Sequence, residues 1–440
     1  MKERRLILGA AAAVLCLVVV LLGGVFDDSS PAGSAVVPSA SAGIPVDTGF
    51  AQGDTQGLVA GLQATLRSDP YDVRSLDELA LAYQQRARET GDPTYYTKSG
   101  EALHRALGVA PRDLVATSGL GSLALSRHRF AEALALGRRA HAISPTTARN
   151  YGVIGDALVE LGHYRAAFRA FDTMASIQPG LSSYARIAHA RYLVGDLSGA
   201  IESMKLAVAA SAGQGEAEAW AWTHLQLGKL YWSQGRLAAA QTEFRDSLNA
   251  FPHYPYAYDG LAQVEQARGR LDAAIALERR AVNLIPLPQF VGSLGDMYSR
   301  VGRAADARRQ YATISVIERL LRANGVKTDL ETALFDVDHG IRPQASLALA
   351  RVAQRERPSI DGDDVLAWAL ARTGHCGEAL HYSKRALRLG TLDSLKFFHR
   401  GMIERCLGHR AEAKDWFIRA LDLNPHFSLL WAPIAGRYAR

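Results

Sequence analysis

The sequence lacks the features that most enzymes and nucleic-acid-binding proteins need. It contains no His-Glu-x-x-His, no Cys-x-x-Cys and no phosphate-binding loop ending in Gly-Lys-Ser or Gly-Lys-Thr. Its 50 basic residues exceed its 44 acidic residues only slightly, and the net charge of +6 forms no basic stripe of the kind that binds nucleic acid. The 13 histidines show no metal-ligand spacing. We therefore expect no enzyme activity, no metal or other cofactor, and no nucleic-acid partner.

Two acidic clusters that could hold a cation have simpler structural interpretations. The run from Asp361 to Asp364 suits the first turn of a helix, with Ser359 or the first aspartate as its N-terminal cap. Asp336, Asp338 and His339 lie together at the end of an expected helix and could ligate a metal. We interpret these three as solvated residues of a turn.

A long uncharged apolar stretch follows a basic N-terminus. Lys2, Arg4 and Arg5 precede the 21 residues from Leu6 to Phe26, and at about 1.5 Å per residue a helix of this length crosses a hydrocarbon core of about 30 Å. Basic residues on the short N-terminal side predict that this end stays in the cytoplasm and that the rest of the chain lies outside. Residues 1–26 are therefore a predicted transmembrane signal-anchor in the cytoplasmic membrane.

Two alternatives remain for this N-terminal segment. A cleaved signal peptide would release a secreted protein, although the small residues Ala40-Ser41-Ala42 lie late for cleavage. Lipidation at Cys16 would need a smaller residue than Leu15 before it. Residues 27–52, rich in Ser, Pro, Ala and Gly, predict a flexible linker between the anchor and the folded part.

Proline and glycine recur along the chain with a period near 34 residues. Pro111, Pro145 and Pro179 are 34 residues apart, as are Pro252 and Pro286. A period in this range predicts a solenoid of helix pairs, each too small to bury its own core and stable only when stacked on its neighbours. A glycine series repeats in the same register and consists of Gly162, Gly195, Gly235, Gly269, Gly302, Gly340, Gly374 and Gly408.

Within one period, the order of small and large residues resembles the tetratricopeptide repeat. That family follows the pattern Trp-x2-Leu-Gly-x2-Tyr-x8-Ala-x3-Phe-x2-Ala-x4-Pro. The unit that ends at Pro425 contains its small and aromatic positions at Gly401, Gly408, Ala413, Phe417 and Ala420. The resemblance covers roughly residues 56 to 440. It implies an all-α fold, a right-handed superhelix of about ten helix pairs, over residues 53–440.

Each residue type of the unit has a structural role. A first small residue lets helix A and helix B, the two helices of a pair, approach closely, and a glycine then ends helix A in a left-handed conformation.

We also expect helices outside the regular units. A single helix from Leu58 to Arg67 should precede the array, a closing helix from Phe427 to Arg440 should follow it, and one helix is lengthened through Ile317 and Leu321. We expect ten units, whose first small residues are Ala80, Gly121, Gly155, Ala188, Gly228, Ala262, Gly295, Ala333, Ala367 and Gly401.

The resemblance also implies a peptide-binding groove on the inner wall of the superhelix. The family lines this wall with helix A residues, and aromatic rings interleaved with both signs of charge offer a peptide stacking area and polar partners. The simpler alternative is that the tryptophans pack between units. The candidate groove residues are Arg149, Asp156, Glu160, His189, Tyr192, Trp222, Lys229, Trp232, Tyr256, Asp259, Gln263, Asp296, Arg300, Trp368 and Arg372.

The predicted function is a non-catalytic scaffold that binds a protein or peptide partner on the outer face of the cytoplasmic membrane. An alternative is an accessory subunit of a membrane transporter or of an envelope-synthesis complex. The two differ in whether the predicted membrane span itself contacts the partner.

Two cysteines outside the predicted span lie near equivalent turns of adjacent units. Cys376 follows Gly374 by two residues and Cys406 precedes Gly408 by two, so both side chains should lie along one edge of the solenoid. Stacked helices are about 8–10 Å apart, and a disulfide needs Cα atoms within about 7 Å, which places the pair near the limit of reach. An oxidising compartment favours a disulfide; the alternative is two buried thiols.

Overall fold

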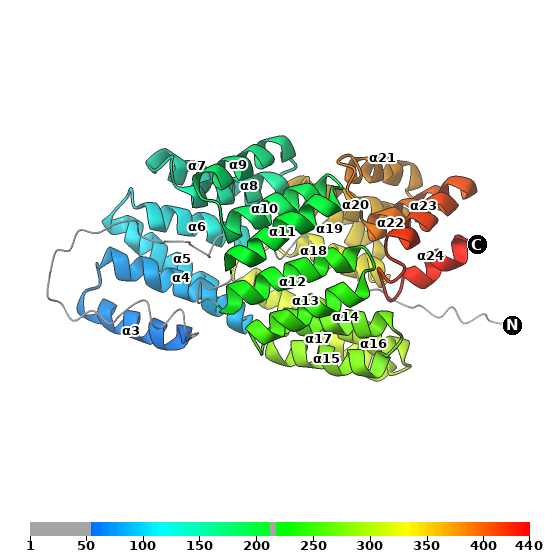
Figure 1. The fold of residues 1–440 in the computed structure, drawn as a ribbon, viewed down its shortest axis with the longest axis horizontal. Helices are drawn as coiled ribbons and strands as arrows, with labels where there is room; N and C mark the ends of the chain where they lie inside the picture. The colour runs from blue at the N-terminus through cyan, green and yellow to red at the C-terminus, as the bar shows by residue number, and fades with distance from the viewer. Residues whose placement is uncertain (1–53, 212–216) are drawn as a thin grey trace.

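The described part of the computed structural model, residues 54–211 and 217–440, consists of 22 helices and contains no strand (Figure 1). The helix α3 (Thr55–Ser68) comes first and α24 (Ala432–Tyr438) comes last. Between them lie ten pairs, each a helix A packed against a helix B. The pairs are α4 (Val73–Thr90) with α5 (Thr94–Val109), α6 (Leu114–Ser126) with α7 (Phe130–Ile143), α8 (Ala148–Glu160) with α9 (Tyr164–Ile177), α10 (Leu181–Leu193) with α11 (Leu197–Ser211), α12 (Ala217–Ser233) with α13 (Leu237–Ala250), α14 (Pro255–Ala267) with α15 (Leu271–Leu284), α16 (Pro288–Arg300) with α17 (Ala304–Ala323), α18 (Asp329–Asp338) with α19 (Pro343–Glu356), α20 (Ile360–Arg372) with α21 (Cys376–Ala386), and α22 (Ser394–Cys406) with α23 (Arg410–Leu423).

These pairs confirm the all-α fold and the expected number of units. The single helices before and after the array are confirmed as well, although α24 starts five residues later than the expected closing helix, at Ala432. The predicted lengthening through Ile317 and Leu321 is present in α17, which has 20 residues where most of its neighbours have 13 or 14.

The predictions for the N-terminus concern residues outside the described part. The signal-anchor of residues 1–26 and the linker of residues 27–52 both fall there. Within residues 54–211 and 217–440, no helix combines the length and the apolar character that a membrane span requires. The membrane anchor therefore stays a prediction.

Two small positions shape each helix pair. The eight predicted turn glycines all have positive φ, between +64° and +86°, a conformation that glycine adopts freely and that ends helix A. At the first small position of the unit, on helix A, a Cβ on Gly228 would lie 2.5 Å from the ring of Phe244, and a Cβ on Gly401 would lie 2.6 Å from the ring of Phe417. The ring on helix B thus fills the space that the absent Cβ leaves on helix A.

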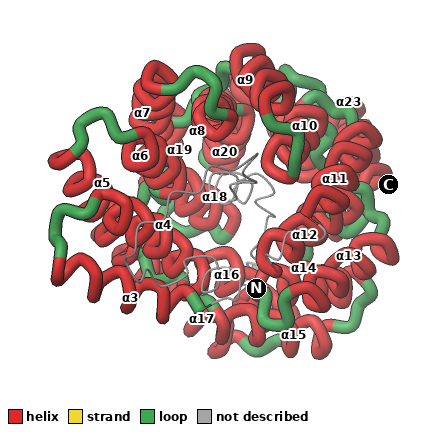
Figure 2. Tube along the Cα trace, turned by 60° about the vertical axis from the view of Figure 1, so that its left-hand side comes forward, coloured by secondary structure: helices red, strands yellow, loops and turns green. Residues whose placement is uncertain are grey.

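The helix pairs curve into a superhelix that completes more than one turn. In Figure 2 the pairs from α4 to α17 follow one another around a ring. Beyond α17, the loops between units contact the helix A–helix B turns of earlier units, at sequence separations of 192 to 199 residues. One turn of the superhelix therefore takes roughly six repeats. We call this row of contacts between the two turns the seam.

Hydrogen bonds join the two turns at four successive places along the seam. The carbonyl oxygen of Lys327 lies 2.8 Å from Nδ1 of His128, and the Arg129 guanidinium donates to the carbonyl oxygen of Gly325 at 3.0 Å. Because these bonds use backbone groups of the loops, they fix the distance between the turns. The other bonds join the Ile360 N–H to the Tyr164 hydroxyl, the Thr391 hydroxyl to the Leu193 carbonyl, and the Asn424 amide to the Trp232 carbonyl.

Gly162→Ala tests the seam, with Gly302→Ala as its matched control. Both glycines end a helix A, at φ of +74° and +80°, so alanine costs each site about 1–2 kcal/mol of backbone strain. Only at Gly162 would the new Cβ overlap a residue of the other turn, the carbonyl oxygen of Pro358, whereas nothing lies within 4 Å of a Cβ at Gly302. We expect Gly162→Ala to lower the melting temperature by several degrees more than Gly302→Ala. Equal losses would show that the seam adds no stability.

Candidate binding cavity inside the superhelix

The two superhelical turns enclose a cavity of about 430 Å³. Its walls come from helices far apart in the chain, including the end of α4, parts of α12, α14, α16, α17 and α18, and the loop before α24. Aromatic and aliphatic side chains make up much of the wall, among them Phe251, Ile285, Phe290, Phe335 and Phe427. A concave site of this size and character suits a small molecule or a few side chains of a partner.

Five of the predicted groove residues line this cavity. They lie on α12 and α14, the helices A of the fifth and sixth units. The amide of Gln263 donates to the carboxylate of Asp259 at 3.0 Å, which holds both polar groups in place on the wall. The predicted inner wall therefore coincides with the cavity in these two units. The five residues are Lys229, Trp232, Tyr256, Asp259 and Gln263.

Two of the predicted tryptophans are buried between helices instead. Trp222 and Trp368 are 0% and 1% exposed. Trp222 lies inside α12, which packs against α11, α13 and α14. The indole N–H of Trp368 donates to the carboxylate of Asp338 at 2.8 Å, and its ring stacks on His399 with centroids 4.5 Å apart. The expectation that these two rings line an open groove is wrong, because they pack between units as the simpler alternative holds.

Two predicted acidic residues of α8 take part in buried ion pairs. Asp156 accepts hydrogen bonds from Arg186 of the next unit, the shortest at 2.7 Å, and both side chains are almost fully buried. Glu160 pairs with Arg357 across the seam, also in a buried position. Because a buried charge needs a partner of opposite sign, these carboxylates join units to each other and do not face a groove, which corrects their assignment to an accessible wall.

A third predicted acidic residue, Asp296, belongs to a buried polar network. Its carboxylate lies 2.9 Å from Nε2 of His339, and Asp296 is 0% exposed. Next to His339, Asp338 is also buried and accepts a hydrogen bond from the indole N–H of Trp431 at 3.1 Å. Asp336 is buried as well. The interpretation of residues 336, 338 and 339 as solvated is therefore wrong, because the units around them close over the turn.

The other five predicted groove residues lie away from the cavity. His189 stacks on Tyr192 with ring centroids 6.4 Å apart, and burial lowers the pKa of His189 to about 4. Arg300 and Arg372 are exposed, and Arg149 is half-buried. None of the five lines the cavity, so the predicted groove residues that do line it are confined to the fifth and sixth units.

The cavity wall also contains residues that the sequence did not indicate. Arg88 of α4 faces Glu218 at the start of α12, with 3.8 Å between Nε of Arg88 and a carboxylate oxygen of Glu218. Gln85 donates to the other carboxylate oxygen of Glu218, 133 residues away in sequence. Tyr254, just before α14, completes this part of the wall. These groups meet only because the superhelix curves, so no local spacing could have paired them.

A carboxyl pair lies beside the cavity on α14 and α15. Asp259 lines the wall, and Glu278 next to it is 0% exposed. Burial, together with the negative charge of Asp259, raises the pKa of Glu278 well above its ordinary value of 4.5. Burial also raises the pKa of Asp259, against the lowering effect of Lys229. This side of the cavity therefore retains protons that a solvated carboxyl pair would lose.

One group of side chains on the described residues has the proximity of metal ligands. The ligand atoms of His224, Glu243 and Asp246, on α12 and α13, lie within 4.8 Å of one another. Nδ1 of His224 is 2.7 Å from a carboxylate oxygen of Glu243, so a direct hydrogen bond accounts for the closest approach in the group.

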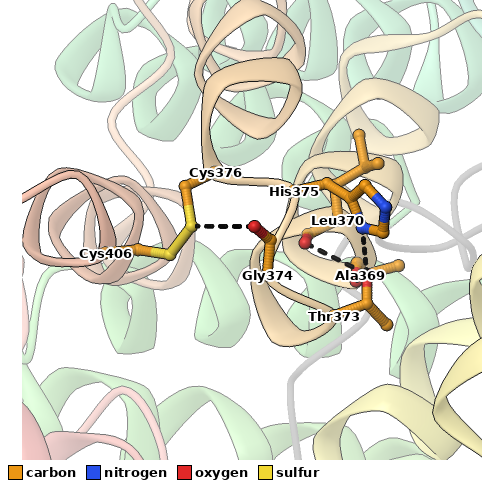
Figure 3. Close-up of a disulfide and its surroundings, with 7 residues drawn as sticks. All are labelled: Ala369, Leu370, Thr373, Gly374, His375, Cys376 and Cys406. Atoms are coloured by element: carbon orange, nitrogen blue, oxygen red, sulfur yellow. Dashed lines mark hydrogen bonds between the residues drawn. A yellow bond between two sulfur atoms is a disulfide. The ribbon is translucent and has the colours of Figure 1, made fainter.

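Cys376 and Cys406 form a disulfide at the edge of the solenoid (Figure 3). Cys376 begins α21 and Cys406 ends α22. Their Cα atoms are 5.9 Å apart, which is inside the limit of about 7 Å for a disulfide. The bond ties the ninth unit to the tenth.

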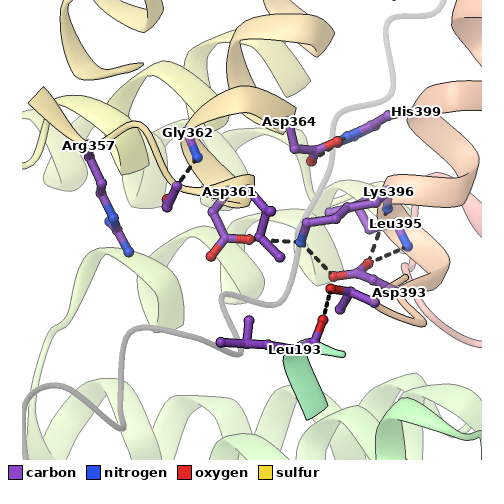
Figure 4. Close-up of polar contacts among 12 residues, drawn as sticks. Leu193, Arg357, Asp361, Gly362, Asp364, Asp393, Leu395, Lys396 and His399 are labelled. Carbon is purple, nitrogen blue, oxygen red and sulfur yellow. Dashed lines mark hydrogen bonds and ion pairs between the residues drawn. The ribbon is translucent and has the colours of Figure 1, made fainter. Parts of the chain in front are cut away.

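The acidic first turn of α20 is a helix cap and part of an ion-pair group (Figure 4). The hydroxyl of Ser359 accepts a hydrogen bond from the N–H of Gly362 at 3.2 Å, which confirms that Ser359 caps this helix. The ammonium group of Lys396 on α22 lies 2.8 Å from both Asp361 and Asp393. The acidic run thus joins α20 to α22.

The architecture defines a class of protein: a helical solenoid whose stacked pairs enclose an interior. Residues 96–148 and 225–289 match the family model of the tetratricopeptide repeat. These two segments are therefore tetratricopeptide repeats, in agreement with the repeat pattern of the sequence. No curated protein matches the sequence.

Several solved structures are similar to this chain at low sequence identity. A human IFIT1 dimer with m7Gppp-AAAA is 13% identical over 85% of this chain and 87% of that chain, with a TM-score of 0.45. A tetratricopeptide repeat protein from Parabacteroides merdae is 14% identical over 53% of this chain and 88% of that chain, with a TM-score of 0.41. YrrB, a tetratricopeptide repeat protein with an unusual peptide-binding site, is 16% identical over 42% of this chain and 93% of that chain, with a TM-score of 0.28.

Trp222→Ala and Trp220→Ala separate core from surface on one helix. Trp222 is 0% exposed and Trp220 is 42% exposed. Truncation of a buried tryptophan costs about 3–5 kcal/mol, whereas a surface truncation changes stability by about 0.5 kcal/mol or less. We expect thermal scans to show a large drop in melting temperature for Trp222→Ala and almost none for Trp220→Ala. Equal melting temperatures would contradict the buried position of Trp222.

Glu278→Gln should reduce the loss of stability at high pH. The unfolded chain releases the Glu278 proton near the ordinary value of 4.5, whereas the folded protein keeps it to a much higher pH. The folded state therefore binds more protons over this range, and its stability falls as the pH rises above about 4.5. We expect melting temperatures measured from pH 5 to pH 9 to fall less steeply in Glu278→Gln. The exposed Glu202→Gln is the control; identical slopes in all three proteins would refute the prediction.

Proposed function

We propose that this chain is a non-catalytic scaffold that binds a protein or peptide segment inside its superhelix and is displayed on the outer face of the cytoplasmic membrane. The observation that carries the proposal is the cavity between the two turns, lined by Lys229, Trp232, Tyr256, Asp259 and Gln263. These residues place aromatic surface beside charged and amide groups, the combination that anchors peptide side chains.

The seam favours binding inside the superhelix because it holds the cavity walls in position. Residues of the wall come from units in both turns, and the hydrogen bonds of the seam connect those turns along the chain. A partner therefore meets a wall that is already ordered, and less conformational entropy is lost on binding. Trp232 illustrates the coupling, since it lines the cavity and its carbonyl oxygen accepts a seam hydrogen bond from Asn424.

Two independent features support an extracytoplasmic location. The basic N-terminus and the apolar stretch from Leu6 to Phe26 are typical of a signal-anchor. The disulfide between Cys376 and Cys406 suits an oxidising compartment, since structural disulfides persist there and are rare in the cytosol.

Cross-linking on intact cells with a membrane-impermeant reagent tests location and binding surface together. We expect the wild-type chain to be labelled without lysis and to be captured with a distinct partner. Gln263→Trp, which places a larger ring in the cavity, should lose that partner because Gln263 lines the wall. Gln344→Trp makes the same substitution at an exposed position of α19 outside the cavity and should retain it.

The outcomes of the cross-linking experiment are separable. Labelling only after lysis would show that the proposed location is wrong. If intact cells are labelled and Gln263→Trp captures the same partner as the wild type, the partner binds elsewhere on the solenoid. The melting temperatures of Gln263→Trp and Gln344→Trp are compared as a control. If they are equal, loss of the partner in Gln263→Trp is not caused by unfolding.

A further inference from the structure

The part of the cavity wall around Arg88 and Tyr254, which we call its polar end, is not used by the proposed function. Arg88 lies there, and its side chain is 8% exposed. Among the described residues, neither Nε nor Nη2 of Arg88 has a hydrogen-bond partner. The hydroxyl of Tyr254, which is 3% exposed, also has none. Buried polar groups are nearly always hydrogen-bonded. Three unused donors on two residues that line one cavity therefore indicate a missing acceptor.

The charge of Arg88 is only partly compensated by the protein. Glu218 is the nearest carboxylate, but its oxygen is 3.8 Å from Nε of Arg88, which is beyond hydrogen-bond distance. The other oxygen of Glu218 is occupied by Gln85. Tyr96, Tyr254 and Tyr256 lie within the electrostatic reach of Arg88. Burial raises the pKa of each tyrosine, the negative charge of Glu218 raises the pKa of Tyr254 and Tyr256 further, and the positive charge of Arg88 acts to lower all three.

The space next to this polar end is apolar. Tyr256 contacts Tyr254 with ring centroids 5.3 Å apart and contacts Phe290 at 5.4 Å. Ile285 approaches from the other side, against Gly91 at the end of α4. A ligand that reaches Arg88 therefore lies with the rest of its body against rings and an aliphatic side chain.

The acidic residues of the wall limit the ligand to a single negative charge. Glu218 and Glu331 both line the cavity, and two carboxylates in the wall repel a phosphate with two charges more strongly than an anion with one. A carboxylate carries one charge and two oxygens, which match the two free nitrogens of the guanidinium in a planar fork.

We infer that the cavity is a binding site for a small organic carboxylate with an apolar body, held by the Arg88 guanidinium and the Tyr254 hydroxyl, with its body against Ile285, Tyr256 and Phe290. The volume of about 430 Å³ is that of a small-molecule site. This site shares Tyr256 with the wall of the proposed protein-binding function, but its two donors, Arg88 and Tyr254, are not part of that function, and it needs no protein partner.

Calorimetric titration of the full chain in lipid nanodiscs tests this site with three probes that share one body. The probes are 4-phenylbutyrate, its neutral amide, and 4-phenylbutylamine. We expect the carboxylate to bind at least about tenfold more tightly than the amide, since only the anion adds the attraction of its own charge, and a second acceptor oxygen, to the hydrogen bonds that Arg88 donates. The amine should bind most weakly, because the guanidinium repels it. Equal affinity of the carboxylate and the amide, or no binding of any probe, would overturn the inference.

Variants assign the binding to the two donors. Arg88→Gln should remove the preference for the carboxylate over the amide. Tyr254→Phe should weaken carboxylate binding several-fold without lowering the melting temperature, since its hydroxyl has no hydrogen bond to lose within the described protein. Arg74→Gln is the control: Arg74 lies on the same helix and pairs with Glu78 at 2.7 Å, and neither residue is part of the cavity wall.

The variant results decide between this site and an unspecific one. Carboxylate binding that survives both Arg88→Gln and Tyr254→Phe would show that the anion lies elsewhere. If Arg88→Gln alone does not fold, the double variant Arg88→Gln with Glu218→Gln removes both charges together and replaces it in the titration. Probe binding and partner capture are measured separately, so either the carboxylate site or the protein-binding function can fail without the other.

Discussion

The seam between the two superhelical turns is the constraint on which the rest of this structure depends. An open solenoid is stabilised only by contacts between neighbouring units, but here loops also contact units almost 200 residues away, as in the pairs of Arg129 with Gly325 and of Asn424 with Trp232. These contacts convert a one-dimensional array into a closed body with an inside. Burial of Glu160, which pairs with Arg357 across the seam, follows from the same closure.

The sequence contains the repeating unit but not its curvature. Gly228 facing Phe244, and the positive φ of Gly235, follow from residue types at fixed spacing within one unit. The rotation between units adds up from small differences in packing, and no local pattern encodes the number of units in a turn. The number of helix pairs was therefore predictable, whereas the contact of His128 with Lys327 was not.

The same limit explains which of the predicted groove residues line the cavity. Lys229 and Gln263 line the cavity because α12 and α14 face the interior at a place where the two turns leave space. Trp368 occupies a comparable position in its own unit, yet the tenth unit and the last helix cover it, with the ring of Trp431 5.5 Å away. A pattern that repeats in every unit predicts the same exposure in every unit, and the ends and turns of a real array make the exposure differ.

The polar end of the cavity shows what the closed superhelix adds to the proposed anion site. Arg88 belongs to the first unit, Glu218 to the fifth, and Tyr254 adjoins the sixth, so each is an ordinary helix or loop residue when its unit is considered alone. Closure removes water from Arg88 and leaves two of its nitrogens without a partner among the described residues. A donor in that state binds an anion more strongly than a solvated arginine does, because the effective dielectric constant around it is lower. The proposed anion site therefore depends on the closed superhelix and not on any single repeat.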